Sequence, residues 1–120
     1  MQKTLNKDLI LKQDDLQLKG VDVPEWGGHI YVRGLTGTER AKWESYVVSV
    51  TKNGKPKPNA NLRESVLIYA LCDASGKRLF KDEDAHLLAE KNGAVIEKLF
   101  KIAADLSGLN DEDIEAAEKN

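Results

Sequence analysis

The sequence is poor in the residues that build disulfide scaffolds and metal sites. It has a single cysteine, Cys72, so it can form neither an internal disulfide nor a cysteine-based zinc site. Its two histidines, His29 and His86, do not stand at a spacing that would pre-form a metal site. We therefore predict no metal and no cofactor, and the lone cysteine is compatible with a reducing compartment.

Long apolar runs and a surplus of one charge are also missing. No stretch approaches the roughly 20 apolar residues of a membrane-spanning helix, and Lys and Asp interrupt Met1–Gln13 before it reaches signal-peptide length. The 18 basic and 20 acidic residues give a formal charge of -2, which is no basis for strong phosphate binding. We interpret the local cluster of Lys52, Lys55 and Lys57 as a solvated loop. We expect a soluble, cytosolic protein that binds neither membrane nor nucleic acid.

Recognisable catalytic motifs are absent as well. Ser45 and Ser65 lie in no Gly-x-Ser-x-Gly elbow, although the sequence leaves open a spatial triad with a histidine. The glycines at 27–28 and 34–37 lack the lysine and the spacing of a phosphate loop. The acidic runs 82–84 and 111–113 lack the alternating ligands of a calcium loop, and they suit the first turn of a helix. We therefore predict that the chain is not an enzyme and has no catalytic residue.

What the sequence does contain is enough apolar material for one modest core. Of its 120 residues, 41% are hydrophobic and 32% are charged. Residues 16–33 predict a β-hairpin, with apolar side chains alternating on the first strand, a bulge at Gly20 and a turn at Gly27-Gly28. Pro24 ends the first strand, and residues 29–33 are rich in β-branched and aromatic side chains.

Four helices are expected after the hairpin. Thr36 and Glu39 form a capping-box pattern before an apolar face that places Trp43 in the core. Residues 53–59 read as a loop, and the next helix begins near Asn61 and contains Cys72 as a small buried hydrophobe. A short helix is predicted from Asp82, as N-cap, through Ala89, and after a break at Asn92-Gly93 a last helix is predicted to stop at Ser107-Gly108.

These elements define an α+β fold with an N-terminal hairpin followed by a bundle of about four helices. Residues 1–15 show no clear period, and we treat them as an N-terminal lead that can be mobile. Residues 16–109 form the single α+β domain. Residues 110–120 form an acidic C-terminal helix or tail that Asn110 can cap and that can fray.

The order and the amino-acid residues of several motifs resemble those of the tail assembly chaperones of long, non-contractile-tailed bacteriophages. The resemblance rests on Val21-Asp22-Val23-Pro24-Glu25-Trp26-Gly27-Gly28 and on Ile30-Tyr31-Val32-Arg33-Gly34-Leu35-Thr36-Gly37-Thr38-Glu39-Arg40. It continues through Asn61-Leu62-Arg63, Gly76-Lys77-Arg78-Leu79-Phe80, Leu99-Phe100 and Leu106-Ser107-Gly108-Leu109. The match covers nearly the whole chain.

The resemblance implies a function that composition does not show. Such proteins are non-catalytic, bind the long tape measure protein, keep it soluble and help tail tube subunits gather around it. The present chain would be the shorter product, and a longer frameshifted form would recruit the tail tube protein. The resemblance places the chain in the host cell cytoplasm and outside the mature virion, and it permits homo-oligomers.

Trp26 is the residue most suited to partner binding, because tryptophan is common at binding hot spots. The competing interpretation, slightly favoured, is that it folds over the hairpin and covers the core. Given the resemblance, we hypothesise that Trp26 and Tyr31 help form the contact surface. The alternative functions are a minor structural tail or connector component of the virion, a small enzyme or ligand-binding domain, and a prophage-encoded host adaptor.

Overall fold

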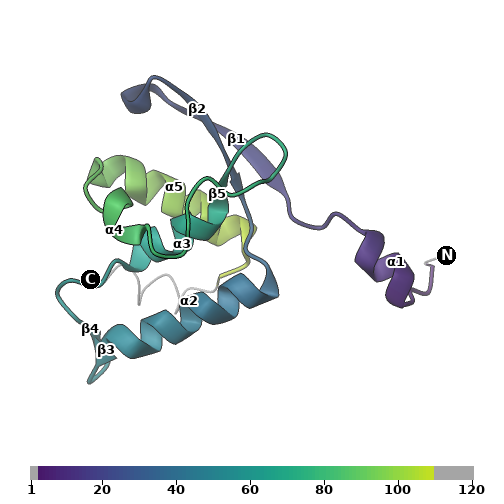
Figure 1. Ribbon diagram of the computed structural model, residues 1–120, viewed down its shortest axis with the longest axis horizontal. Coiled ribbons are helices and arrows are strands. Elements are labelled where there is room, and N and C mark those ends of the chain that lie inside the picture. Colours follow the sequence, from purple (N-terminus) through teal and green to yellow (C-terminus); the bar gives the residue numbers. More distant parts are fainter. Residues whose placement is uncertain (1–2, 110–120) are drawn as a thin grey trace.

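The computed structural model describes residues 3–109, so the predicted acidic segment 110–120 lies outside the described residues. In chain order the elements are α1 (Lys7–Lys12), β1 (Leu18–Val23), a short 3-10 helix (Pro24–Trp26), β2 (Gly28–Arg33), α2 (Gly37–Val50), β3 (Thr51–Lys52), β4 (Lys55–Pro56), α3 (Leu62–Ala70), β5 (Leu71–Cys72), α4 (Ala85–Leu88) and α5 (Gly93–Leu106). The predicted α+β fold, a hairpin followed by four helices, is confirmed (Figure 1).

The hairpin pairs β1 with β2 without interruption. The register is antiparallel and unbroken from Leu18 opposite Arg33 to Val23 opposite Gly28, so the predicted bulge at Gly20 is wrong. Gly20 lies opposite Tyr31 in this ladder, and a Cβ there would make only an ordinary contact of 3.5 Å with the Tyr31 ring. The turn also lies earlier than the Gly27-Gly28 pair. It uses Pro24 to Trp26 and closes at Gly27, whose φ of 75° suits glycine.

A third strand completes the sheet, which has the order β1-β2-β5. Cys72 belongs to this strand, so its predicted place in a helix is wrong, although its predicted burial is confirmed. The helix α3 ends at Ala70 because Leu71 and Cys72 become extended and pair with β2, which satisfies backbone groups on that edge. The Asp73 carboxylate then accepts from the backbone N–H of Ser75 and Lys77, at 2.9 and 3.0 Å, and fixes the following turn.

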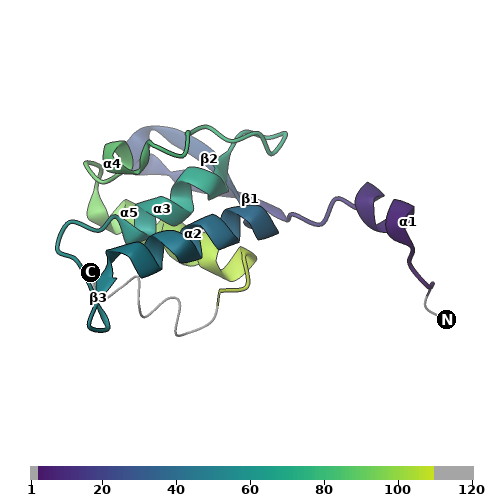
Figure 2. The same cartoon turned by 60° about the horizontal axis from the view of Figure 1, so that its bottom comes forward.

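The helix α3 lies at the centre of the molecule, between α2 and α5 (Figure 2). It is apolar on nearly all sides, as a helix enclosed by others must be. Its buried side chains are Leu62, Ser65, Val66, Leu67, Ile68, Tyr69 and Ala70. The helix α5 packs on both α3 and β2 and closes the core with Val95, Ile96, Leu99, Phe100, Ala103 and Ala104. Its predicted end at Ser107-Gly108 is confirmed, with Gly108 at a φ of 66°.

The start of α2 follows the capping box predicted from the sequence. The Thr36 hydroxyl accepts from the Glu39 N–H at 3.1 Å, and the Glu39 carboxylate accepts from the Thr36 N–H at 3.0 Å. Trp43, predicted as core, is only 2% exposed, and its indole N–H donates to the Leu62 carbonyl at 3.3 Å. That hydrogen bond lets the indole be buried without leaving a polar group unsatisfied.

Two connecting segments differ from their predicted form. The predicted loop over residues 53–59 begins with the turn of a small hairpin that joins β3 to β4, and its Asn53-Gly54 pair has φ of 55° and 76°. The short helix α4 begins at Ala85, with Asp84 at its N-cap position, so Asp82 as the predicted N-cap is wrong. The Asp82 carboxylate instead forms ion pairs with two cations, Lys42 at 3.1 Å and Arg78 at 2.8 Å.

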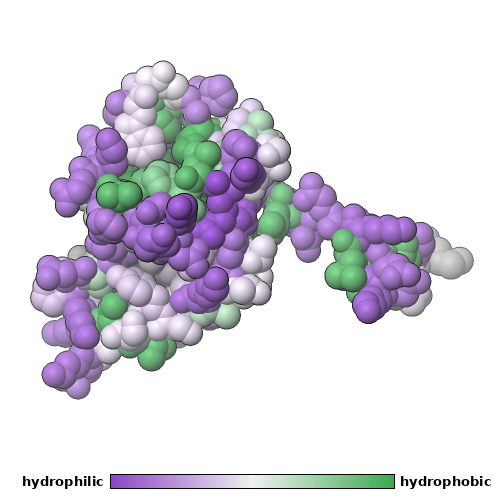
Figure 3. Space-filling model, in the orientation of Figure 1, coloured by the Kyte–Doolittle hydropathy of each residue, from purple (hydrophilic) through white to green (hydrophobic). Residues whose placement is uncertain are grey.

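The N-terminal segment stands apart from the rest of the described chain. Residues 3–17, which we call the arm, contain α1, and no residue of α1 is buried. The Asn6 side chain caps α1 by accepting from the Leu9 N–H at 3.0 Å. Figure 1 shows α1 at the end of an extended link, and Figure 3 shows apolar side chains exposed on it. We call residues 18–109 the body.

The connection from β2 to α2 joins the sheet, α2 and the end of α5. Arg33 is buried and forms a two-pronged ion pair with Glu39, with both N–O distances 2.9 Å. The next residue, Gly34, passes so close to α5 that a Cβ on it would lie 2.7 Å from the Leu106 carbonyl oxygen. The Leu35 N–H then donates to the Ser107 hydroxyl oxygen at 3.1 Å.

Replacing Gly34 with Ala should destabilise the protein, because the new methyl group would collide with backbone that cannot rotate away. We expect the free energy of unfolding to fall by about 1–3 kcal/mol, measured by urea denaturation. Gly37→Ala is the matched control, since a Cβ there meets no atom within 4 Å. Equal stability of the two variants would contradict the close approach of Gly34 to α5.

The Arg33–Glu39 pair should make stability depend on pH in the acid range. Burial alone raises the pKa of Glu39, but the hydrogen bond from Arg33 and that from the Thr36 N–H together hold this pKa below its ordinary value. The ionised carboxylate therefore stabilises the fold above the unfolded pKa of about 4.3, and this contribution is lost as the pH falls through the lower folded pKa.

Glu39→Gln tests this dependence. At neutral pH it should lower the free energy of unfolding by roughly 3 kcal/mol, because it leaves Arg33 buried without its anion. The difference from wild type should shrink as the pH is lowered toward the folded pKa, followed by urea denaturation across that range. Glu44→Gln, at an exposed position of the same helix, is the control. A difference that stays constant with pH would rule out the ion pair as its source.

Candidate functional site

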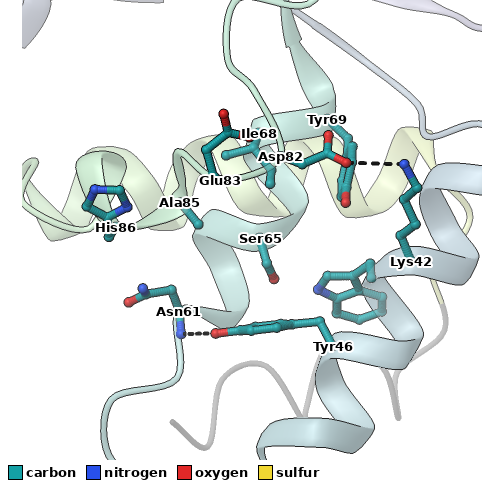
Figure 4. A pocket seen from close by; sticks show the side chains of 11 residues that line it. Lys42, Tyr46, Asn61, Ser65, Ile68, Tyr69, Asp82, Glu83, Ala85 and His86 are labelled. Carbon is teal, nitrogen blue, oxygen red and sulfur yellow. Dashed lines mark hydrogen bonds and ion pairs between the residues drawn. The ribbon is translucent and has the colours of Figure 1, made fainter.

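Two concave places on the body could receive a partner. The first, which we call the helical cleft, has a volume of about 240 Å³ and lies among α2, α3 and the start of α4 (Figure 4). Its lining residues are Lys42, Trp43, Tyr46, Asn61, Ser65, Ile68, Tyr69, Asp82, Glu83, Ala85 and His86. Pockets for drug-sized ligands run from roughly 300 to 1,000 Å³. The helical cleft therefore suits one or two apolar side chains better than a cofactor.

Charged groups hold one side of the helical cleft in place. Lys42 on α2 reaches Asp82, which also receives Arg78 (Figure 4 shows the Lys42 contact). The hydrogen bond from Arg78, followed by that from Lys42, lowers the pKa of Asp82. The Arg78 guanidinium also lies over the Tyr69 ring, 4.7 Å from its centroid. Segment 78–82 is thereby fixed to both α2 and α3.

The hydroxyl groups in the helical cleft have structural partners. The Tyr46 hydroxyl oxygen accepts from the Asn61 N–H at 2.9 Å, and the Ser65 hydroxyl donates to the Leu62 carbonyl at 2.6 Å. Ser65 and His86 line the same cleft, yet no hydrogen bond joins them in the described structure. The arrangement does not form a nucleophile–base pair, and Ser45 lies elsewhere, on the exposed surface of α2.

The second concave place, which we call the hairpin groove, lies at the tip of β1 and β2. It has a volume of about 180 Å³ and is lined by Val23, Trp26, Gly28, His29, Ile30 and Leu79. Trp26 is half-buried and packs against the core, while Leu79 is 52% exposed. The groove therefore offers a tryptophan face beside exposed aliphatic surface, and its wall combines the hairpin with the segment after β5.

The structure places Trp26 in the lining of the hairpin groove but leaves Tyr31 outside it, with His29 bordering both. Side chains alternate between the faces of a strand, and Ile30, which pairs with Val21, packs on the core side with Trp26. Tyr31 therefore faces the opposite side, where its ring meets that of His29 edge-on at 5.7 Å. Partner binding by either residue stays a prediction. Because the two side chains lie in different places, a contact at Trp26 and a contact at Tyr31 are separate hypotheses.

Cys72 is fully buried within the sheet. Its thiol donates to the Tyr31 carbonyl at a sulfur–oxygen distance of 3.6 Å. Burial raises the pKa of this thiol, with Arg33 opposing the effect and Asp73 adding to it. A buried thiol with a raised pKa is a packing residue and a poor nucleophile.

Within residues 3–109, no three His, Cys, Asp or Glu side chains gather in a way that could hold a metal ion. Both histidines are exposed, His29 on β2 and His86 on α4. None of the helices in this part of the chain is long and apolar enough to span a membrane.

The helical cleft was not predicted from the sequence. The periodicity of two helices placed Tyr46 and Tyr69 on apolar faces, which indicates burial and nothing more. Only the packing of α2 against α3, with segment 78–86 laid across both, turns these faces into the walls of a cavity.

Comparison with known proteins finds a matching family model and a similar solved structure. A family model described as phage tail assembly chaperone matches residues 6–120. Among solved structures, the chain is similar to the tail assembly chaperone of bacteriophage HK97, with 26% sequence identity and a TM-score of 0.60 over 76% of this chain and 85% of that one. No curated protein matches at a significant level. Because the family model spans almost the entire sequence and the resemblance of its motifs is thereby confirmed, the chain belongs to the phage tail assembly chaperone family.

Proposed function

We propose that this chain binds a phage tape measure protein, keeps it soluble and promotes assembly of the tail tube around it, without catalysing a reaction. The observation that carries the proposal is the hairpin groove, an apolar surface with a tryptophan on a member of the tail assembly chaperone family. A tape measure protein is a long helical chain, and its exposed apolar stripe aggregates when it is uncovered. An apolar groove can cover part of such a stripe.

The small size of the groove fits a reversible chaperone. At about 180 Å³ it receives a side chain or two, so one contact is weak. Several copies along one tape measure chain would gain from avidity, which makes weak individual contacts sufficient. Weak contacts also permit release when tube subunits replace the chaperone. In this proposal the protein acts in the host cytoplasm and leaves no copy in the virion, and a longer frameshifted form recruits the tube protein.

Co-expression with the tape measure protein tests the proposal directly. We expect the tape measure protein to become soluble and to co-purify with this chain, because its apolar stripe is covered. If it aggregates regardless, the experiment is repeated with the longer form, and aggregation there too would sink the proposal. Detection of the chain in purified virions would instead support a minor structural tail component.

Trp26→Ala tests the hairpin groove as the contact. Truncation removes a large half-buried ring, and we expect co-purification of the tape measure protein to fall by about tenfold or more. Tyr31→Ala, on the opposite face of the hairpin, separates the two predicted contacts, since only the residue that touches the partner should matter. Thermal unfolding of each variant must remain cooperative. Undiminished co-purification with folded Trp26→Ala would remove the groove from the interface.

A further inference from the structure

The arm carries apolar side chains that nothing in the described chain covers. Leu5 is 56% exposed, Ile10 is 54% exposed and Leu11 is 72% exposed. The helix α1 has only six residues, and an isolated helix of that length is unstable in water. Its cap at Asn6 provides one hydrogen bond, which does not replace tertiary packing. The arm therefore has the composition of a segment that becomes stable when its apolar side docks on a surface.

The helical cleft has the size and the apolar walls that such a segment requires for docking. Its volume of about 240 Å³ admits one or two aliphatic side chains, and Trp43, Ile68 and Tyr69 supply apolar walls. The Tyr46 and Ser65 hydroxyl groups and the Asp82 carboxylate already have partners within the body, so an aliphatic side chain that enters the cleft leaves few polar groups unsatisfied.

Charge and position indicate whether the arm would enter the helical cleft of its own molecule or that of another. At the mouth of the cleft Glu83 forms no ion pair with another described residue, while Lys7 and Lys12 are exposed on α1 beside its apolar residues. In Figure 1 the arm leaves the body on the right, whereas α4, at the edge of the cleft, lies on the left side of the body. This arrangement favours a contact between the arm of one molecule and the cleft of another.

We propose that the arm of one copy docks in the helical cleft of a second copy, with Ile10 and Leu11 in the cleft and a lysine of α1 near Glu83. The contact is heterologous, because each copy offers a different surface on each side. Every copy can then donate one arm and accept another. This self-association does not depend on the proposed tape measure binding, which uses the hairpin groove.

Sedimentation velocity of the full-length chain over a concentration range tests the contact with two complementary variants. The arm variant carries Ile10→Ser and Leu11→Ser and keeps its cleft. The cleft variant carries Ala85→Arg, which blocks the mouth and repels the lysines, and keeps its arm. Each variant alone should associate on the order of 100-fold more weakly than wild type. An equimolar mixture should form a heterodimer that grows no further, because only one competent interface remains.

Two controls keep the outcome interpretable. Val48→Ser changes a residue that is 75% exposed on α2, outside the arm and the cleft, and it should associate like wild type. Glu83→Lys changes only an exposed charge at the mouth and should weaken association if Ala85→Arg happens to unfold the body.

Three results would overturn the proposal. In the first, wild type stays monomeric at all concentrations, which leaves the arm free or places it in its own cleft. In the second, the arm variant is monomeric while the folded cleft variant associates normally, which places the arm on another surface. In the third, the mixture of folded variants fails to form a heterodimer.

Discussion

The ion pair between Arg33 and Glu39 is the interaction on which the arrangement of layers depends. Arg33 ends β2, and Glu39 belongs to the first turn of α2, so the pair fixes the angle at which the chain leaves the sheet and enters the helices. Glu39 serves the capping box at the same time. One carboxylate thus neutralises a buried cation and stabilises a helix start, and between the two residues the chain passes close to the end of α5 at Gly34.

The helix α3 lies at the centre of this arrangement. Once α2 is set against the end of α5, the space between them admits only a helix that is apolar on nearly all sides. The same enclosure pushes segment 78–86 to the surface, where Arg78 and Asp82 fasten it. The helical cleft and the hairpin groove both border this segment, the groove at Leu79 and the cleft from Asp82 to the start of α4.

Local signals predicted most helices correctly because their causes are local. The capping box at Thr36 and Glu39, the stop at Ser107-Gly108 and the burial of Trp43 each follow from a pattern within one or two turns. The errors have a different origin. Cys72 was misplaced because its pairing with the distant strand β2 overrides the local preference for helix, and Asp82 because its carboxylate pairs with Arg78, four residues earlier, and with Lys42 of α2.

By itself the sequence determined the α+β class, the hairpin, the core faces of the helices and the family. The spacing of apolar residues, the turn residues and the order of motifs can all be recognised from the sequence alone. The tertiary structure alone decided that Trp26 and Tyr31 face opposite ways and that a cleft opens among α2, α3 and α4. The tertiary structure also decided the exposure of the arm, since the burial of a side chain depends on which residues pack against it in space. The physical reason is that a binding surface is assembled from residues far apart in sequence, and no local pattern records their approach.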